Sequence, residues 1–280
     1  MAAFALVTGA TAGIGRAAAI ALARAGFEVF ATGRREEALA ELVAEAGGLP
    51  VRAMTLDVTD AASIERARAE VDVATGGHGL DVLVNNAGYG QFGPLEEISD
   101  ADVRAQFDTN VFGLLAVTRA FLPAMRLRGS GRIINISSLS GLFTMPLMGA
   151  YHATKYAVEA LSDALRIEVG GCGVGVVLVE PGMIRTGFEE RTQREVARYG
   201  GTGSPYAPAM GRLARLVGTL YRKAPGAERV VRVIVKAAVA RRPKARYATP
   251  VLDRLGITIA RILPTRLMDF AFRRVLGLPR

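Results

Sequence analysis

The chain opens with the stretch Phe4-Ala5-Leu6-Val7-Thr8-Gly9-Ala10-Thr11-Ala12-Gly13-Ile14-Gly15. Its first five residues form an apolar run typical of a short buried strand, and residues 16–25 favour a helix. Glycine lets the backbone approach a ligand closely, and a helix N-terminus presents unpaired N–H groups and the positive end of its dipole. The stretch therefore predicts a strand, a tight turn and a helix that cradle a phosphate group. A plain strand-to-helix turn is the alternative, because the glycine spacing differs from G-x-G-x-x-G.

A second informative stretch is Tyr151-His152-Ala153-Thr154-Lys155, with Ser138 thirteen positions upstream of the tyrosine. Four residues make slightly more than one helical turn, so a helix places Tyr151 and Lys155 on one face. A phenol has a pKa of about 10, and a nearby positive charge favours its anion. The pattern predicts that Lys155 lowers the pKa of Tyr151 and prepares a site for proton transfer. The same spacing also arises on helices without such a role.

Strand-like runs alternate with helix-like segments along most of the chain. The predicted strands are Phe4 to Thr8, Val29 to Thr32, Val51 to Asp57, Val82 to Asn85, Arg132 to Ser137 and Val174 to Glu180. The predicted helices are Ala12 to Ala25, Arg35 to Ala46, Asp60 to Thr75, Asp100 to Met125 and Tyr151 to Val169. Such alternation predicts an α/β fold, a doubly wound parallel sheet of Rossmann type with a ligand cleft at the carboxyl ends of the strands.

Seven features occur in the order and at the intervals of one enzyme family. They are Thr8-Gly9-x-x-x-Gly13-x-Gly15, Asp57-Val58, Asn85-Asn86-Ala87-Gly88, Asn110, Ser138, Tyr151-x-x-x-Lys155 and Pro181-Gly182-x-x-x-Thr186. On these residues the chain resembles the short-chain dehydrogenase/reductase family from Phe4 to about Phe188. Further runs, among them Gly93-Pro94-Leu95-Glu96-Glu97, are similar to the branch that contains 17-beta-hydroxysteroid and retinol dehydrogenases.

The resemblance implies a nicotinamide dinucleotide cofactor. The predicted cofactor-binding residues are Gly9, Thr11, Gly13, Ile14, Gly15, Arg34, Arg35, Asp57, Val58, Asn85, Ala87, Gly88, Tyr151, Lys155, Pro181, Gly182, Ile184 and Thr186. By resemblance, Asp57 and Val58 flank the adenine, the segment Asn85 to Gly88 lines the ribose side, and Ile184 with Thr186 holds the carboxamide of the nicotinamide.

The predicted catalytic residues are Ser138, Tyr151, Lys155 and Asn110. In this mechanism Ser138 donates a hydrogen bond that orients a carbonyl, and Tyr151 delivers a proton as general acid while hydride reaches the carbon. The resemblance implies that Lys155 also binds the nicotinamide ribose and that Asn110 holds a water that relays protons to it. One alternative is a cofactor-bound regulatory protein without chemistry, which would be expected to lose one of these side chains. The other is a peripheral membrane-binding protein, which would explain the basic C-terminal segment but not these four residues.

Cofactor preference depends on the end of the second predicted strand, where Gly33 is followed by Arg34 and Arg35. An acidic side chain there would accept hydrogen bonds from a ribose 2′-hydroxyl and repel a 2′-phosphate. Guanidinium groups suit a phosphate, so we predict NADP(H) in preference to NAD(H). The alternative is that both arginines are simply solvated at the start of a helix.

Charge is distributed unevenly along the chain. Residues 1–190 hold 15 Lys and Arg against 22 Asp and Glu, whereas residues 191–280 hold 20 against 4. Near the end of the chain, the apolar residues Leu267, Phe270, Ala271 and Val275 recur at helical spacing opposite charged residues. The pattern predicts a short basic amphipathic helix that lies on an anionic membrane surface, or that packs on its own domain or on a subunit. Nucleic-acid binding is not expected, because no recognition motif or aromatic platform accompanies the arginines.

At 280 residues and 50% hydrophobic content, the chain can bury a large core, and we expect a single domain. Residues 1–190 form its predicted dinucleotide-binding and catalytic core. Residues 191–280 form a predicted substrate lid and a basic helical C-terminal extension. Short segments rich in glycine and proline occur in the lid, which extends to about residue 226. The predicted cleft-wall residues are Tyr89, Phe92, Leu139, Phe143, Met145, Met148 and Met183.

The branch resemblance implies an apolar ketone or aldehyde and its alcohol as substrates, of steroid, retinoid or acyl-chain type. Cys172 is the only cysteine, no secretion signal is recognisable, and only two histidines are present. We therefore expect a cytoplasmic protein without a metal site, membrane-associated if the basic extension binds lipid. The resemblance also implies a homodimer or homotetramer, assembled through the helices near Asp100 to Met125 and His152 to Val169.

Overall fold

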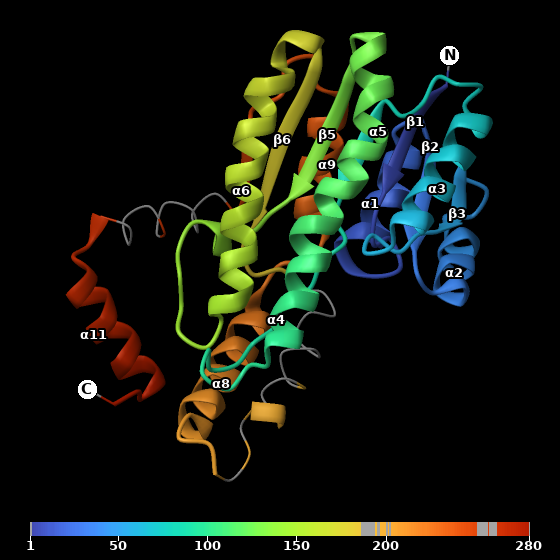
Figure 1. Ribbon diagram of the computed structural model, residues 1–280. Helices are drawn as coiled ribbons and strands as arrows, with labels where there is room; N and C mark the ends of the chain where they lie inside the picture. The colour runs from blue at the N-terminus through green and yellow to red at the C-terminus, as the bar shows by residue number, and fades with distance from the viewer. Residues whose placement is uncertain are drawn as a thin grey trace.

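The computed structural model describes residues 2–185, 194, 197–199, 201, 203–250, 257 and 262–279. Parallel strands form one seven-stranded sheet in the order β3-β2-β1-β4-β5-β6-β7 (Figure 1). The strands are β1 (Ala3–Val7), β2 (Phe27–Gly33), β3 (Val51–Thr55), β4 (Val82–Asn85), β5 (Gly131–Ile136), β6 (Val174–Pro181) and β7 (Arg246–Thr249). This order confirms the predicted doubly wound fold of Rossmann type.

Helices connect the strands and continue toward the end of the chain. They are α1 (Gly13–Arg24), α2 (Glu36–Ala46), α3 (Ala61–Ala74), α4 (Asp100–Phe107), α5 (Leu114–Arg128), α6 (Gly149–Val169), α8 (Ala207–Lys223), α9 (Glu228–Val239) and α11 (Thr265–Leu276). A π-helical turn, η1 (Asp108–Gly113), separates α4 from α5, so the predicted helix Asp100 to Met125 is interrupted. A 3₁₀ turn, η2 (Leu139–Gly141), follows β5.

The two sides of the strands pack against different helices. In β1, Ala5 and Val7 join a hydrophobic cluster with α1, α2 and α9, whereas Leu6 joins a cluster with α3, α5 and α6. This division follows from the two-residue period of a strand. Figure 1 shows α5 and α6 in front of the sheet. Because both faces are covered, the central strands β1, β2, β4 and β6 are mostly apolar runs, as is typical of parallel sheets.

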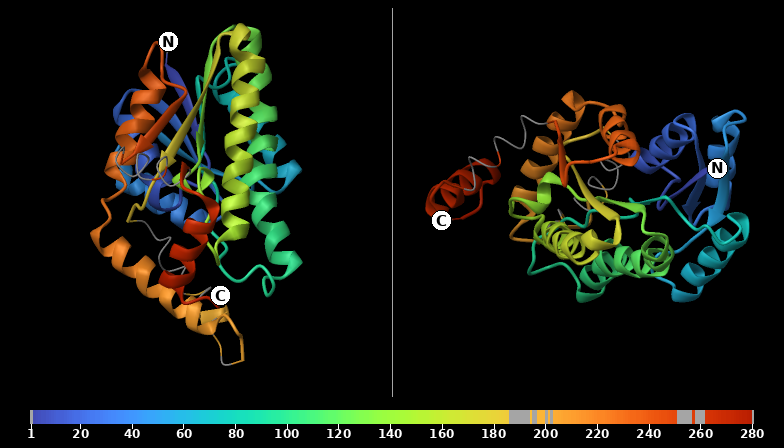
Figure 2. Two further views of the ribbon diagram at one scale, coloured as in Figure 1. Left: turned by 90° about the vertical axis from the view of Figure 1, so that its left-hand side faces the viewer. Right: turned by 90° about the horizontal axis from the view of Figure 1, so that it is seen from above.

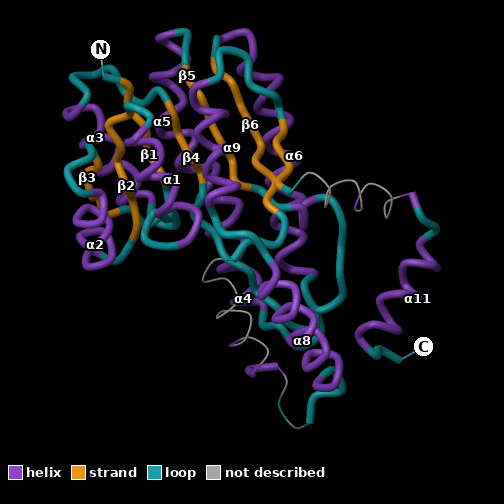
Figure 3. The backbone as a smooth tube through the Cα atoms, turned by 180° about the vertical axis from the view of Figure 1, so that it is seen from behind, coloured by secondary structure: helices purple, strands orange, loops and turns teal. Residues whose placement is uncertain are grey.

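The strand order reverses between β1 and β4. The chain passes from β1 to β2 and β3 on one side, and then returns to pair β4 with the other side of β1 (Figure 3). Connections that leave in opposite directions open a crevice at the carboxyl ends of the strands. The glycine turn after β1, the segment after β4 and Ser138 after β5 all follow strand ends of this edge.

A third hydrophobic cluster joins the C-terminal helices to the rest of the molecule. It contains Met210, Leu213 and Tyr221 of α8, Leu276 of α11, and residues of the loop before α6. α11 lies at the outer edge of the molecule, away from the sheet (Figure 2). Within the described part of the chain, no helix is both long and apolar enough to cross a membrane.

Two sequence-based expectations for the C-terminal part need comment. No strand is predicted for residues 246–249, because Arg-Tyr-Ala-Thr is short and not apolar, yet these residues pair with β6 as β7. The predicted boundary between residues 190 and 191 lies outside the described residues, as does part of the predicted lid. The division of the chain into a core and an extension therefore stays a prediction.

Candidate active site

The glycine turn after β1 has a backbone that glycine adopts readily and other residues do not. Gly9 and Gly13 have φ angles of +65° and +55°. A Cβ on Gly15 would lie 2.3 Å from the carbonyl oxygen of Gly9 and 2.4 Å from Nδ2 of Asn86. Gly15 therefore lets the first turn of α1 press directly against the loop that precedes it.

The N-terminus of α1 suits an anionic ligand. Its N-cap residue, Ala12, provides no capping side chain, and the first turn holds no acidic residue. The first N–H groups of the helix are therefore not satisfied by a side chain, and the dipole attracts negative charge. With the close-packed glycines and the partly exposed Thr11 and Ile14, this end of α1 fits the pyrophosphate of a dinucleotide.

Thr8 and Asn86 fasten the glycine turn to the end of β4, a role that the sequence analysis did not give to either residue. The Thr8 hydroxyl accepts hydrogen bonds from the backbone N–H groups of Asn86 and Ala87, both at 2.9 Å. The Asn86 amide donates to the carbonyl oxygens of Thr8 at 2.9 Å and Gly9 at 3.1 Å. A signal was available, because polar residues directly at the end of an apolar strand commonly bind backbone groups.

The end of β2 is packed closely against Thr11. A Cβ on Gly33 would lie 2.5 Å from Cγ2 of Thr11, so a larger residue would displace the threonine. The exposed Arg34 follows, and its guanidinium lies 3.8 Å from the carboxylate of Asp57. Arg35 is the N-cap residue of α2, is exposed, and forms no ion pair with any described residue. Two guanidinium groups thus lie at the end of β2, and their contact with a ribose phosphate stays a prediction.

Asp57 keeps its charge next to Arg34. Burial acts to raise the pKa of Asp57, but hydrogen bonds from Thr59 and the charge of Arg34 bring it below its usual value. The Asp57 carboxylate therefore offsets part of the positive charge of Arg34. The neighbouring Val58 packs its side chain into the cluster with α3 and α5, so a contact with a cofactor would come from its backbone.

The segment after β4 is only partly available to a ligand. Asn85 is 4% exposed, and its side-chain amide donates to Thr118 and to Asn135, both at 2.9 Å. The Asn85 side chain thus points into the protein, and the lining of the ribose side by the segment Asn85 to Gly88 stays a prediction. Ala87 is partly buried and Gly88 is exposed. A Cβ on Gly88 would lie 3.0 Å from Oδ1 of Asn110, so glycine lets the backbone pass close to the Asn110 side chain.

Ser138 and Tyr151 come together as predicted. α6 begins at Gly149, which puts Tyr151 in its first turn and Lys155 one turn later. The hydroxyl of Ser138 forms a hydrogen bond with the Tyr151 phenol, and it also accepts one from the Ser140 N–H at 3.0 Å. The serine is thereby held at the start of η2 with its hydroxyl beside the phenol.

Lys155 follows Tyr151 by one turn of α6. Its Nζ donates to the Ile136 carbonyl oxygen at 2.9 Å and lies 5.9 Å from the centroid of the Tyr151 ring. Burial lowers the pKa of Lys155 to about 8, and the charge of Glu159 opposes that change. Burial raises the pKa of Tyr151 to about 12, and the hydrogen bond with Ser138 opposes the rise. The predicted lowering of the Tyr151 pKa is therefore not found, because desolvation of the phenolate outweighs the opposing hydrogen bond with Ser138.

Asn110 lies in the π-helical turn η1 and is almost fully buried. Its Nδ2 donates to the Tyr89 carbonyl oxygen at 2.8 Å and to the Thr154 hydroxyl at 3.1 Å. Its Oδ1 accepts from the Tyr89 N–H at 3.0 Å. Since the side chain holds two segments of the protein together, a water relay at Asn110 would have to use its backbone carbonyl. π-turns often occur at functional sites because they free backbone groups.

The segment after β6 is tied to β7 and to Ser138. The Gly182 N–H donates to the Thr249 carbonyl oxygen at 2.9 Å, and the Ser138 hydroxyl lies 3.4 Å from the Pro181 carbonyl oxygen. Ile184 is 4% exposed and packs into the cluster with α1 and α9. Thr186 lies outside the described residues.

The predicted cleft-wall residues fall into two groups. Phe92 and Leu139 are buried in the protein, and the Phe92 ring lies 6.1 Å from the Tyr151 ring. A partly exposed set comprises Tyr89, Phe143, Met145, Met148 and Met183. Its three methionines border the third hydrophobic cluster, so flexible apolar side chains flank the segment that leads to Tyr151.

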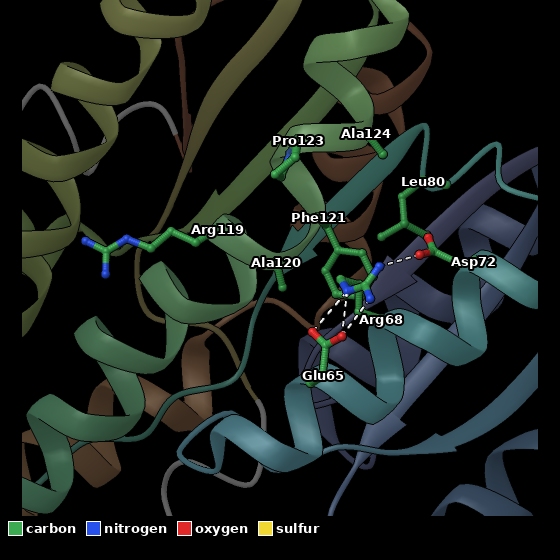
Figure 4. Close-up of a pocket in the computed structure, with 10 residues that line it drawn as sticks. Glu65, Arg68, Asp72, Leu80, Arg119, Ala120, Phe121, Pro123 and Ala124 are labelled. Carbon is green, nitrogen blue, oxygen red and sulfur yellow. Dashed lines mark hydrogen bonds and ion pairs between the residues drawn. The ribbon is translucent and has the colours of Figure 1, made fainter.

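A surface pocket of about 360 Å³ lies elsewhere, between α3 and α5 (Figure 4). There Arg68 pairs with Glu65 and Asp72 of the same helix, whereas Arg119 points away from them. None of the described residues that line the pocket is a predicted site residue. The candidate site is therefore defined by the strand ends and α6, not by this pocket.

Comparison with known proteins identifies the family. A family profile described as short chain dehydrogenase matches residues 3–197, well over half of the chain. The chain belongs to the short-chain dehydrogenase/reductase family. This membership confirms the resemblance read from the glycine turn, Ser138 and the Tyr151-x-x-x-Lys155 pattern.

Relatives in the family cover nearly the whole chain. The uncharacterized oxidoreductase YbbO of Escherichia coli is 36% identical over 94% of this chain and 91% of its own. A 3-ketodihydrosphingosine reductase of Bacteroides thetaiotaomicron is 33% identical over 96% of both chains. An NADPH-dependent 3-dehydrocapnine reductase of Ornithobacterium rhinotracheale is 32% identical over 96% of this chain and 95% of its own. The finer resemblance to 17-beta-hydroxysteroid and retinol dehydrogenases stays a prediction.

Solved structures share the fold. A short-chain dehydrogenase from Streptomyces avermitilis has a TM-score of 0.79 at 36% identity and covers 98% of both chains. A Burkholderia phymatum family member in complex with NAD has a TM-score of 0.80 at 28% identity over 92% of both chains. A metagenomic short-chain oxidoreductase in complex with NADP has a TM-score of 0.61 at 36% identity, over 64% of this chain and 81% of its own. The fold binds a nicotinamide cofactor, and similar structures hold either form.

Proposed function

We propose that the protein is an NADP(H)-dependent oxidoreductase that interconverts an apolar ketone or aldehyde and its alcohol. The observation that carries the proposal is the hydrogen-bonded pair of Ser138 and Tyr151 with the buried Lys155 one helical turn along. Family membership and the dinucleotide-fitting end of α1 support it.

In this proposal the nicotinamide supplies or accepts the hydride when bound. Ser138 orients the carbonyl oxygen, and Tyr151 gives it a proton. Because burial raises the pKa of Tyr151 to about 12, the phenol keeps its proton at neutral pH, as the acid of a reduction must. Alcohol oxidation needs the phenolate, so its rate is expected to rise with pH toward that value, whereas reduction proceeds at neutral pH.

NADP(H) is proposed because the end of β2 carries Gly33 in place of an acidic residue and presents Arg34 and Arg35. A carboxylate at that position is the feature that would repel a 2′-phosphate. The relative that reduces 3-dehydrocapnine is named NADPH-dependent, which agrees with this assignment.

A long, apolar carbonyl compound is the proposed substrate class. Two relatives are named for reductions at carbon 3, of 3-dehydrocapnine and of 3-ketodihydrosphingosine, and the second compound carries a long alkyl chain. The partly exposed Met145, Met148 and Met183 could adapt to such a chain. Acyl-chain ketones are therefore favoured over rigid steroids or retinoids.

The test is the oxidation of NADPH against carbonyls of graded chain length. Tyr151→Phe should abolish turnover while NADPH binding persists, because only the proton donor is removed. Tyr156→Phe is the matched control, since it removes a phenol 39% exposed on the same helix and should keep activity. Turnover that survives Tyr151→Phe would overturn the mechanism. If wild-type protein binds NADPH but reduces none of the panel, the cofactor-bound regulatory alternative is favoured.

We also propose peripheral binding of α11 to an anionic membrane surface. The predicted apolar stripe faces outward, with Leu267, Phe270 and Val275 being 50%, 58% and 54% exposed. The nearby Arg266, Arg273 and Arg274 are exposed and form no ion pair with described residues. The helix thus meets its own domain through another edge, and apolar and basic groups are left together, as in interfacial helices.

Sedimentation with phosphatidylglycerol-containing vesicles tests this binding. Wild-type protein should bind them and should not bind pure phosphatidylcholine, and the double variant Leu267→Ser, Phe270→Ser should lose most of the binding. Val73→Ser, which removes a side chain 83% exposed on α3, is the control and should bind normally. Equal binding by all variants would contradict a role for α11.

Self-association through α5 and α6 is the remaining part of the proposal. Exposed apolar side chains lie on or next to these helices, among them Phe112, Leu127 and Ile167 at 58%, 85% and 73% exposure. Such surfaces favour contacts between subunits. Light scattering of the purified protein should give a dimer or tetramer, and a monomer would contradict this part.

A further inference from the structure

The buried face of α6 carries a stripe of ionisable residues that extends past the candidate catalytic pair. Tyr151, Lys155 and Glu159 follow one another at intervals of four, so their side chains lie one above the other. All three are nearly buried, with exposures of 8%, 8% and 7%. A carboxylate seldom occupies such a position without a partner, because burial of a charge is costly.

Arg246 of β7 supplies that partner. Its Nε lies 3.3 Å from Oε2 of Glu159 and 3.2 Å from Oε1 of Glu180, which is fully buried on β6. The same guanidinium pairs with Asp163 on the outer end of the stripe. One arginine thus faces three carboxylates, and Asp163 receives a second cation from Arg166 at 3.1 Å. Glu159 is the member of this cluster that lies one helical turn from Lys155.

Glu159 is also packed against the turn that holds Ser138. A Cβ on Gly141, the last residue of η2, would lie 2.9 Å from Cγ of Glu159 and 2.9 Å from the Lys155 carbonyl oxygen. Glu159 therefore packs against the turn that holds Ser138, close to the backbone of Lys155. Its position is therefore fixed from three sides, by β7, by η2 and by its own helix.

We propose that Glu159, anchored by Arg246, is a positioning residue that keeps Lys155 in its ammonium form beside Tyr151. The role rests on the proposed function, because a charged lysine at this point matters only if it serves the phenol and the cofactor. Neither Glu159 nor Arg246 belongs to the predicted set of Ser138, Tyr151, Lys155 and Asn110.

The physical reason is the low polarity around the lysine amine. Burial alone favours the neutral amine, and it lowers the pKa of Lys155 to about 8 even with Glu159 present. An opposite charge on the same helix face acts against this loss. Burial likewise raises the pKa of Glu159, and Arg246 opposes that change, so the arginine helps to keep the carboxylate charged.

Among the described residues, Glu159 is the charged group that acts on the Lys155 amine. Asp163 on the same helix, Glu180 on β6 and Arg246 on β7 form one ion-pair cluster with Glu159. From β5 the Ile136 carbonyl oxygen accepts a hydrogen bond from the amine, and the Tyr151 phenol lies one helical turn away on the same helix face. Glu159 is therefore the anion that counters burial of the lysine amine.

The test is a pH titration of the lysine amine by NMR in protein labelled with ¹³C-lysine. The chain has only four lysines, Lys155, Lys223, Lys236 and Lys244, so Lys155 can be assigned from a Lys155→Arg variant. In the cofactor-free protein, Glu159→Gln should lower the Lys155 midpoint by about one pH unit or more. Glu168→Gln, which removes an exposed carboxylate from the same helix, should leave it unchanged. Glu159→Asp should restore most of the wild-type value.

Coupling between two sites is reciprocal, which provides a second variant if Glu159→Gln does not fold. Lys155→Met should raise the titration midpoint of the Glu159 carboxyl in ¹³C-glutamate-labelled protein. Unchanged midpoints in whichever variants fold would overturn the proposal. In the active enzyme, the alkaline limb of the NADPH-dependent reduction should move to lower pH in Glu159→Gln by the same interval. Because the titrations need no substrate, an inactive wild-type protein with the expected midpoint shifts would reject only the proposed reaction.

Discussion

Two regions of the molecule are held in shape by different means. At the strand ends, buried side chains bind backbone directly, as when Thr8 accepts hydrogen bonds from Asn86 and Ala87. At the outer edge, α11 meets α8 through apolar packing in which Leu276 is its only fully buried side chain among the described residues. Hydrogen bonds therefore fix the positions of backbone atoms at the strand ends, whereas the packing of α11 leaves most of its side chains on the surface.

The difference has energetic consequences. Leaving a buried backbone donor without its acceptor costs about 1–3 kcal/mol, while substitutions of exposed side chains usually stay within about 0.5 kcal/mol. Changes at the strand ends should therefore affect folding and cofactor binding together. Changes on the exposed face of α11 should affect only what that face contacts.

The largest effect is expected at the strand ends, when alanine replaces a glycine and adds one methyl group. Gly15→Ala would place a Cβ 2.3 Å from the Gly9 carbonyl oxygen, so α1 must move away from the turn. We expect a loss of about 1–3 kcal/mol in the free energy of unfolding, as in overpacked cores, together with loss of NADPH binding. Urea unfolding and NADPH fluorescence would measure the two effects.

Gly211→Ala is the matched change in α8. A Cβ there meets no atom within 4 Å, and alanine favours a helix over glycine by about 1 kcal/mol. This variant should be slightly more stable than wild type and should bind NADPH normally. If the two alanine variants behave alike, the contrast between a tightly fitted turn and a tolerant outer helix is wrong.

The same contrast explains what could be predicted from the sequence. Strand ends, the glycine turn and the Tyr151-x-x-x-Lys155 pattern are local, so their placement follows from periodicity and spacing. The direction of the Tyr151 pKa is not local, because it depends on burial by segments such as that of Phe92. The cluster of Glu159, Glu180 and Arg246 joins three elements, and no spacing in the sequence reveals it.

Side-chain direction was the other limit of sequence analysis. Asn85 lies where predicted along the chain, but its amide turns inward to Asn135 and Thr118. The apolar stripe of α11 was identified correctly as a helix face, yet Leu267 and Phe270 face outward while Leu276 is buried. A helical pattern shows that one face is apolar, and only the neighbouring elements decide which part of it is covered.

A smaller effect is expected from substitution of the arginines at the end of β2. These side chains are proposed to select between the two cofactors and do not hold the fold together. The double variant Arg34→Ser, Arg35→Ser should weaken NADPH binding about tenfold or more, since a charge-assisted hydrogen bond is worth about 1.5–3 kcal/mol. NADH affinity should change little, because the 2′-phosphate is the group that these side chains would contact. Titration of both cofactors by fluorescence measures the ratio.

Arg24→Ser, Arg52→Ser is the control for this pair, because it removes two exposed arginines from the same half of the molecule and is expected to leave the NADPH to NADH ratio unchanged. A wild-type preference for NADH, or equal loss of both cofactors in the Arg34 and Arg35 variant, would contradict the NADP(H) assignment. The ion pair of Arg34 with Asp57 makes Arg35→Ser alone informative, since Arg35 has no carboxylate to share among the described residues.

The smallest effect on stability is expected on α11. Phe270→Ser removes a ring that is 58% exposed, so the free energy of unfolding should change by no more than about 0.5 kcal/mol. The same substitution should markedly reduce binding to anionic vesicles, because the ring would lie among the lipids while the nearby arginines contact headgroups. Thermal unfolding and vesicle sedimentation on one preparation separate the two effects. A stability loss of 2 kcal/mol or more, on the order of that caused by a core cavity, would mean that α11 packs on the protein or on a second subunit through this face.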